Sequence, residues 1–285
     1  MGKDVDALPD VCPLFFGTVL GQIFTLIVVA FAVSGSQSTS AQDRPLPLDQ
    51  RKSGLAFASS DVARLQNDEL ANPGMLWVER GETLWKAKLG AGLQACAECH
   101  TPTNGQHALR GSAGTFPKVV TSTKGQQLLN LEAQINHCRT ERQRSPAFAF
   151  ESEDLLGLTA YVAFQSRGMP LKASIDGAAK PYFERANQLY YTRIGQLNLA
   201  CNQCHEQQYG KRLLAETISQ GHGAGYPAYR FEWQSVGSLN RRLRACFSGV
   251  RAQMPEFGSD DLSSLELFLA WRAQGMAVET PAVRR

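Results

Sequence analysis

Two copies of the pattern Cys-x-x-Cys-His, 105 positions apart, constrain this chain more than any other feature of its sequence. They are Cys96-Ala97-Glu98-Cys99-His100 and Cys201-Asn202-Gln203-Cys204-His205. Cysteines at this spacing can add to the two vinyl groups of a haem, and the following histidine can ligate the iron. A single match could be a zinc or redox site, but two equivalent matches favour covalent haem. We therefore expect two haem c groups, attached through Cys96 and Cys99 and through Cys201 and Cys204, with His100 and His205 as iron ligands.

The sequence around each motif is also repeated. Residues 79–100 match residues 184–205 at several pairs that are all 105 positions apart, such as Glu79-Arg80 with Glu184-Arg185. Each repeat has about the length of one c-type cytochrome domain. We therefore expect a mainly α fold of two tandem cytochrome c-like domains, at 75–172 and 182–285. A linker at 173–181 would join them, and an N-terminal extension at 42–74 would precede them.

The local patterns within each repeat predict helices. Residues 79–89 and 184–194 are expected to form helices that lead into the haem motifs. Ser152 and Ser259 are predicted N-caps, because two acidic residues and an apolar periodic run follow each of them. The closing helices would then span 153–166 and 260–273. Loops are expected at Asn104 to Pro117 and at Gly221 to Pro227, and no alternating pattern is long enough to predict a sheet.

The N-terminal segment is typical of a secretory leader. Leu14 to Val33 is almost entirely apolar, and Thr39-Ser40-Ala41 before Gln42 is a suitable cleavage site. We expect residues 1–41 to be removed as a signal peptide. An uncleaved membrane anchor is the alternative, since the apolar run is about long enough to span a bilayer.

The charge balance of the remaining chain is mildly basic. Without residues 1–41 there are 28 basic and 23 acidic side chains, a net charge of +5. Such a surface suits small anions or acidic protein partners, but it is far from the strong basic patch of a nucleic-acid-binding protein. We expect no nucleic-acid partner.

The sixth ligand of each iron has several candidates in the sequence. Methionine is the usual choice in cytochromes c, and Met254-Pro255 before a closing helix resembles the usual arrangement. The equivalent position of the first repeat is Ser145-Pro146, so methionine cannot serve both haems in this way. Other candidates are Met169, Met276, His107, His137 and His222.

Cys138 and Cys246 are the preferred sixth ligands. They lie at comparable places, 38 and 41 residues after His100 and His205 respectively, and each precedes a proline and a closing helix. Thiolate is a strong ligand for ferric iron. The alternatives are a disulfide between the two cysteines or two buried free thiols. A disulfide would have to bridge the two domains, so we favour ligation of the irons by Cys138 and Cys246.

The two repeats differ in the residues that lead into these cysteines. Arg242 lies four residues before Cys246, on the same face of a helix, and Arg241, Arg244 and Arg251 are nearby. The position four before Cys138 is Gln134. Arginine can bind an oxyanion through paired N–H groups and favours the reactive thiolate form of a neighbouring cysteine. We interpret Arg242 as part of an anion-binding site, against the alternative of a solvated basic helix.

These stretches together resemble the SoxA family, the dihaem subunits of the SoxAX cytochromes of bacterial sulfur oxidation. The resemblance covers about residues 75–283. Its most telling segments are Ile218 to Gly221, Gly225 to Arg230, Arg241 to Cys246 and Glu279 to Arg284. It implies a periplasmic enzyme that binds a smaller monohaem subunit, SoxX, and joins thiosulfate oxidatively to a cysteine of the carrier protein SoxYZ.

The resemblance also assigns roles to individual residues. It implies that Cys246 ligates the second haem and becomes a persulfide as the catalytic intermediate, and that Arg242 binds the substrate. Two electrons would pass to an electron-accepting cytochrome c. The alternatives are a dihaem thiosulfate dehydrogenase that forms tetrathionate and a plain electron carrier. The first would use an axial methionine at one haem, and the second would need no anion site beside its iron.

Overall fold

The structure is a computed structural model that describes residues 46–285 apart from 103, 106 and 123–124. The expected leader at 1–41 and the first residues of the extension at 42–74 lie outside the described residues. By its backbone contacts the chain from Ala41 to Arg285 forms one unit. Within the described part of the chain, none of the helices combines the length and the apolar character needed to cross a bilayer.

The described chain begins with short helices that reach a central sheet. Two 3-10 helices, η1 (Leu48–Gln50) and η2 (Gly54–Phe57), precede α1 (Ser60–Asn67). The Ser59 hydroxyl caps α1 by accepting from the backbone N–H of Val62. Val62 lies in an apolar cluster with Tyr229, Val236 and Val283. The extension is thus anchored on residues from the other end of the chain.

The first half of the chain is built around the buried helix α5. Its elements are α2 (Met75–Lys86), α3 (Cys96–Cys99), η3 (Ala113–Thr115), the hairpin β1 (Lys118–Ser122) and β2 (Gly125–Leu129), α4 (Leu131–Glu141) and α5 (Glu153–Phe164). Helices α2 and α5 cross at Gly81 and Gly157. A Cβ at Gly81 would lie 2.0 Å from the Gly157 carbonyl oxygen, so only glycine permits this approach.

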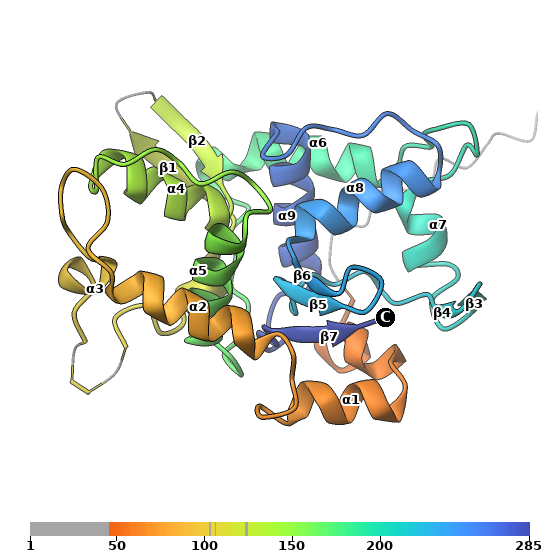
Figure 1. The fold of residues 1–285 in the computed structure, drawn as a ribbon. Helices are drawn as coiled ribbons and strands as arrows, with labels where there is room; N and C mark the ends of the chain where they lie inside the picture. Colours follow the sequence, from red (N-terminus) through yellow and green to blue (C-terminus); the bar gives the residue numbers. More distant parts are fainter. Residues whose placement is uncertain (1–45, 103, 106, 123–124) are drawn as a thin grey trace, which may run out of the picture. The chain divides into compact units, whose positions relative to one another are not determined.

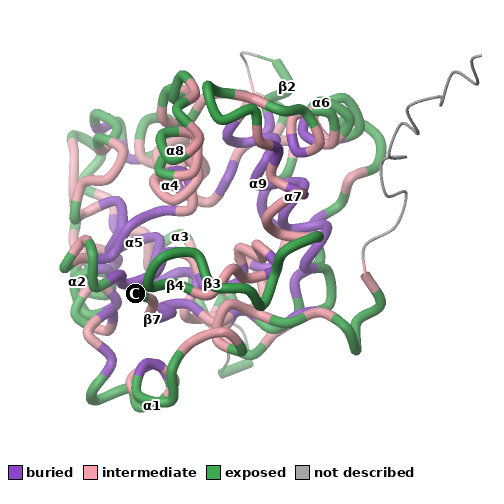
Figure 2. The backbone as a smooth tube through the Cα atoms, turned by 90° about the vertical axis from the view of Figure 1, so that its right-hand side faces the viewer, coloured by how far each residue is buried: buried purple, intermediate pink, exposed green. Residues whose placement is uncertain are grey.

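The second half repeats the same order of helices with additional strands. It comprises η4 (Gly177–Ala179), α6 (Lys180–Tyr191), α7 (Cys201–His205), β3 (Arg212–Leu213), β4 (Glu216–Thr217), β5 (Ala228–Arg230), β6 (Ser235–Gly237), α8 (Leu239–Gly249), α9 (Asp260–Arg272) and β7 (Ala282–Arg284). Helix α9 is buried from Leu262 to Arg272, and Figure 2 shows buried backbone along both α5 and α9. Each closing helix therefore serves as the core of its half.

Most of the predicted helices are confirmed, with shifted ends. The closing helices run from Glu153 to Phe164 and from Asp260 to Arg272, and Ser152 and Ser259 cap them as predicted. The helices predicted at 79–89 and 184–194 begin four residues earlier and end three residues earlier. They end early because the chain must become extended before the left-handed turns at Gly90 and Gly195.

The expectation that the chain forms no sheet was wrong. Strand β5 pairs antiparallel with β6 and parallel with β7, in the order β6-β5-β7 (Figure 1). Each strand has three residues, too few to show an alternating pattern. The register pairs Tyr229 with Val236 on one side and with Val283 on the other. The sheet depends on contacts between segments distant in sequence, which a local pattern cannot show.

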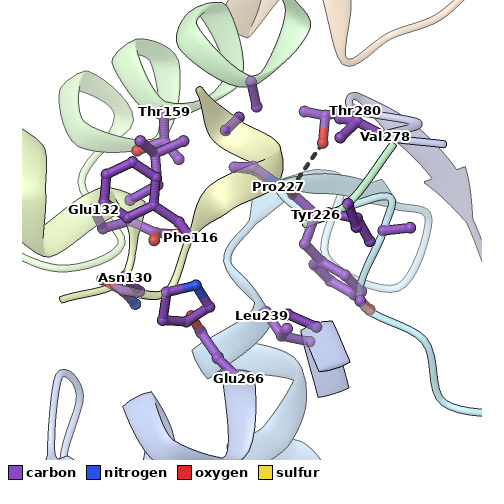
Figure 3. Close-up of a pocket in the computed structure, with 18 residues that line it drawn as sticks. Phe116, Asn130, Glu132, Thr159, Tyr226, Pro227, Leu239, Glu266, Val278 and Thr280 are labelled. Carbon is purple, nitrogen blue, oxygen red and sulfur yellow. Dashed lines mark hydrogen bonds between the residues drawn. The ribbon is translucent and has the colours of Figure 1, made fainter. Parts of the chain in front are cut away.

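A small cavity lies where the two halves meet. It has a volume of about 90 Å³ and is lined from α4, α5, α8, α9 and the loops around Phe116, Tyr226 and Val278. Figure 3 shows two carboxylates among its lining side chains, Glu132 from α4 and Glu266 from α9. Both are buried.

Candidate functional site

The second Cys-x-x-Cys-His motif forms the five-residue helix α7, from Cys201 to His205. The side chain of Gln203 holds its start by accepting from the Ala200 N–H at 2.8 Å. The preceding turn needs glycine at Gly195, where φ is +68° and a Cβ would lie 2.1 Å from the Val250 carbonyl oxygen. This close approach fixes α7 against the C-terminal end of α8, the helix that carries Cys246.

The imidazole of His205 is held in one orientation. Its Nδ1 lies 2.8 Å from the carbonyl oxygen of Ser219, which can only accept. The hydrogen is therefore on Nδ1, and the Nε2 lone pair is left to bind a metal. Gly221 packs against the ring, because a Cβ there would lie 2.9 Å from His205 Cγ. The loop predicted at Gly221 to Pro227 thus supports the histidine from one side.

Cys246 lies beside the imidazole and the other two thiols. Burial raises the pKa of its thiol, but a hydrogen bond with His205 and the charges of Arg242, His205 and Arg230 outweigh burial, so the net pKa is lowered. Burial raises the pKa of Cys201 to about 12, with the nearby Cys246 as the second cause. Burial and then Cys246 also raise the pKa of Cys204. Cys246 is therefore the neighbour that the imidazole of His205 and the thiols of Cys201 and Cys204 share.

Two arginines direct their charge toward Cys246. Arg242 does so from the preceding turn of α8, as predicted, and Arg230 does so from strand β5. Glu232 links them, since its Oε1 lies 2.7 Å from Arg230 Nε and 3.9 Å from Arg242 Nη1. Arg230 and Glu232 were not predicted as site residues. The sequence did hold one indication of a role for Arg230. This residue ends the segment Gly225 to Arg230, which is one of the segments that carry the family resemblance.

The other arginines near Cys246 in sequence make different contacts. Arg241 lies over the ring of Trp233, 4.3 Å from its centroid. Arg244 donates to the Pro255 carbonyl and covers the ring of Phe257. Both guanidinium groups are therefore occupied elsewhere, and Arg242 is the residue of this helix whose charge acts on the thiol.

The first Cys-x-x-Cys-His motif has a matching local structure. Helix α3 spans Cys96 to Cys99, and the Glu98 side chain accepts from the Ala95 N–H at 3.0 Å. Burial raises the pKa of Cys96, and the neighbouring Cys138 contributes next. The thiol of Cys138 accepts from Gln134 Nε2 at 3.2 Å. Cys138 is therefore brought next to the motif, as predicted, but its neighbour four residues earlier is neutral.

His100 has a different environment from His205. Its ring stacks on Trp85 with centroids 5.4 Å apart, and burial lowers its pKa. His107 also contacts Trp85 and lies 3.3 Å from the Tyr161 hydroxyl through Nε2. Figure 1 shows α3 and α7 on opposite sides of the ribbon, so the two motifs form separate sites.

The alternative ligands and the disulfide receive no support. The six cysteines within the described residues are all free thiols, so Cys138 and Cys246 are not bonded to each other. Met254 is 44 % exposed, and Met276 is buried in an apolar cluster with Leu171, Ala273 and Val278. Met169 contacts Gly111. His222 Nε2 is within hydrogen-bond distance of Gln220.

The residues around both motifs fit a covalently bound haem. Apolar side chains surround the thiols: Cys96 packs with the cluster that includes Ile135 and Phe148, and Cys201 with the one that includes Leu243 and Phe247. Several buried polar atoms near these thiols lack a partner among the described residues, namely Arg139 Nη1 in the first site and Tyr190 Oη, His222 Nδ1 and Arg272 Nε in the second. A group with a large apolar plane and acidic side chains would satisfy both features.

Comparisons with known proteins find similar chains. A family model described as SoxA/TsdA, cytochrome c domain, matches residues 80–171. The L-cysteine S-thiosulfotransferase subunit SoxA of Pseudaminobacter salicylatoxidans is 39 % identical over 84 % of this chain and 82 % of that protein. Its counterpart from Rhodovulum sulfidophilum is 36 % identical over 83 % and 81 % respectively. A chain of the crystal structure of SoxXA from P. pantotrophus superposes with a TM-score of 0.77 at 34 % identity, over 82 % of this chain and 87 % of that one.

Proposed function

The chain belongs to the SoxA family of L-cysteine S-thiosulfotransferase subunits, and on that basis we propose that it couples thiosulfate to a cysteine of a carrier protein of the SoxYZ type. It is a cytochrome c with covalently bound haem. The proposed reaction forms a bond between the outer sulfur of thiosulfate and the carrier's thiolate sulfur. Two electrons leave as this bond forms, and two equivalents of an electron-accepting cytochrome c take up one electron each.

The chain's own residues would hold two haem c groups. Cys96 and Cys99 would attach the first and Cys201 and Cys204 the second, with axial pairs His100–Cys138 and His205–Cys246. Haem c, when bound, supplies a one-electron acceptor beside each axial cysteine. The matching order α2-α3-α4-α5 and α6-α7-α8-α9 supports two tandem domains at 75–172 and 182–285, joined by the linker at 173–181.

One observation carries the proposed mechanism: Arg242 and Arg230 direct their charge toward Cys246, whereas the residue four positions before Cys138, which donates to its thiol, is the neutral Gln134. Arg242 and Arg230 would draw in the thiosulfate dianion, and Arg242 would hold its sulfonate end. Cys246, as a persulfide, would present its outer sulfur to the substrate while the cysteine stays in place. The tetrathionate-forming alternative would use one axial methionine, and the exposure of Met254 and the core position of Met276 do not favour it.

The proposal extends to partners and location. A monohaem SoxX-type subunit would bind this chain as a heterodimer, by analogy with the SoxXA complex of P. pantotrophus, whose chain superposes on this one. Export by the leader at 1–41 would place the protein in the periplasm.

The test compares Cys246→Ala with Cys138→Ala. Both variants are purified with the partner subunit, and thiosulfate-dependent reduction of a cytochrome c is measured with and without the carrier protein. Cys246→Ala should abolish the carrier-dependent reaction, and Cys138→Ala should retain much of it. Mass spectrometry should place one extra sulfur on the Cys246 peptide, removable by reductant. Equal loss of activity in both variants, with the second haem intact, would contradict the assignment.

A further inference from the structure

Glu232 occupies an unusual position for a carboxylate, because it lies in the predicted anion site. One of its oxygens, Oε1, contacts both arginines whose charge acts on Cys246. The contact with Arg230 Nε, at 2.7 Å, is a hydrogen-bonded ion pair. The contact with Arg242 Nη1, at 3.9 Å, is too long for a hydrogen bond. The carboxylate therefore accepts a hydrogen bond from Arg230, and its interaction with Arg242 is electrostatic attraction without a hydrogen bond.

The turn between β5 and β6 holds Glu232 there. The last pair of the hairpin is Arg230 with Ser235, and residues 231–234 form the turn. The Trp233 N–H donates to the Arg230 carbonyl at 3.0 Å, and the Gln234 N–H donates to Phe231 at 3.3 Å. These backbone hydrogen bonds define the conformation of the turn, and in this conformation the side chain of Glu232 contacts both guanidinium groups.

Burial distinguishes the two arginines. The side chain of Arg230 is 6 % exposed, so its charge needs a partner, and Glu232 is the one the structure provides. The side chain of Arg242 is 36 % exposed, and its guanidinium donates no hydrogen bond to another described residue. Its N–H groups are therefore available to an entering anion.

Glu232 also faces an open groove. The groove has a volume of about 450 Å³ and is lined by Glu216, Phe231, Glu232 and Arg285 together with residues of α1. The carboxylates of Glu216 and Glu232 both line this groove, and Glu232 is the one in direct contact with Arg242.

We propose that Glu232 sets the affinity of the thiosulfate site, because its carboxylate competes with the sulfonate of the substrate for Arg242. This rests on the proposed function. The competition keeps the affinity for the dianion moderate, so that the sulfonated carrier, which bears the same group, is released after the reaction. Glu216 adds to the same effect from the groove.

Calorimetric titration of the oxidised holoprotein with thiosulfate, without carrier protein, tests the proposal. Glu232→Gln keeps an acceptor for Arg230 but removes the charge. It should bind thiosulfate about three- to tenfold more tightly than the wild type, because a partly exposed unit charge acts on a nearby dianion through an intermediate dielectric. The gain should shrink in high salt. A purely structural role would instead give unchanged or weaker binding.

The matched control is Glu69→Gln. Glu69 of the N-terminal extension pairs with Arg167 at 3.5 Å, so this variant makes the same charge change at a pair that includes neither arginine acting on Cys246. Its affinity for thiosulfate should equal that of the wild type. Glu216→Gln breaks no ion pair among the described residues, so its effect on binding does not depend on how Arg230 is paired. It should tighten binding by a smaller factor, roughly two- to threefold.

The outcomes separate this proposal from the function on which it rests. Failure of the folded wild-type holoprotein to bind thiosulfate, or equal binding by Arg242→Ala, would overturn the proposed function. A different result would overturn the role of Glu232 alone. In that case the wild type binds thiosulfate and Arg242→Ala does not, but neither Glu232→Gln nor Glu216→Gln binds thiosulfate more tightly than the wild type.

Discussion

Glu132 of α4 and Glu266 of α9 line the same buried cavity between the two halves of the chain, and the charge of Glu132 opposes the ionisation of Glu266 (Figure 3). Burial is the main cause that raises their pKa values, to about 7 for Glu132 and to about 8 for Glu266. Asn240 of α8 donates a hydrogen bond to Glu266. The pair therefore lies beside α4 and α8, the helices that carry Cys138 and Cys246, and beside the core helix α9.

This pair predicts that stability falls as the pH rises. A carboxyl whose pKa is raised on folding contributes stability that is present below its unfolded value, near 4.5, and is lost as the pH passes its folded value. Between pH 6 and 8 the pair should contribute a loss on the order of 1–3 kcal/mol, or about 2–4 °C of melting temperature per kcal/mol. Glu266→Gln should reduce this slope in calorimetric scans.

Glu79→Gln is the control for the pH experiment, because Glu79 is exposed on α2. Its melting temperature should follow that of the wild type across the pH range. Parallel curves for the wild type and Glu266→Gln would show that the buried pair does not ionise in this range.

Replacing Arg242 by lysine should mainly weaken the use of thiosulfate. Lysine keeps the charge but loses the paired N–H groups, and a hydrogen bond to a charged group is worth about 1.5–3 kcal/mol, so kcat/KM should fall roughly ten- to hundredfold. Arg244→Lys on the same helix is the control, since Arg244 donates to the Pro255 carbonyl instead. Steady-state kinetics equal to wild type in Arg242→Ala would rule out the role of Arg242.

Replacing methionines should leave the proposed iron ligands intact. Met254 is 44 % exposed and Met276 packs in an apolar cluster, so Met254→Leu and Met276→Leu should keep the low-spin electron paramagnetic resonance signals of the oxidised protein. Cys138→Ala and Cys246→Ala should each alter the signal of one haem. A high-spin haem in either methionine variant would contradict the His/Cys pairs.

Gly221→Ala should disturb the second site through His205. A Cβ at Gly221 would lie 2.9 Å from His205 Cγ, so the ring or the loop must move. Gly210→Ala is a matched control, because φ is also positive there, +83° against +76°, but no atom lies within 4 Å of the added Cβ. Both variants carry the same kind of backbone strain. The visible spectrum and the potential of the second haem should change in Gly221→Ala alone.

Much of the site was accessible from the sequence because its key residues are set by short-range rules. The Cys-x-x-Cys-His spacing places two thiols and an imidazole on one short helix, and the four-residue step from Arg242 to Cys246 places both on one face of α8. Ser152 and Ser259 mark their helix starts for the same local reason. Cys138 lies next to Cys96 and Cys246 next to Cys201, while their ligation of iron stays a prediction.

The sequence by itself determined the residues of this protein that can bind haem and the helices that carry them, because those features depend on spacings of three to five residues. Only the tertiary structure decided which arginines act on Cys246. Arg230 reaches it from a three-residue strand that is held by β7, 54 positions farther along the chain, whereas Arg241 and Arg244 turn away to Trp233 and Phe257. The tertiary structure also brings Glu132 and Glu266 to the same cavity. Such contacts are selected by packing between distant segments, and no local pattern encodes the partner.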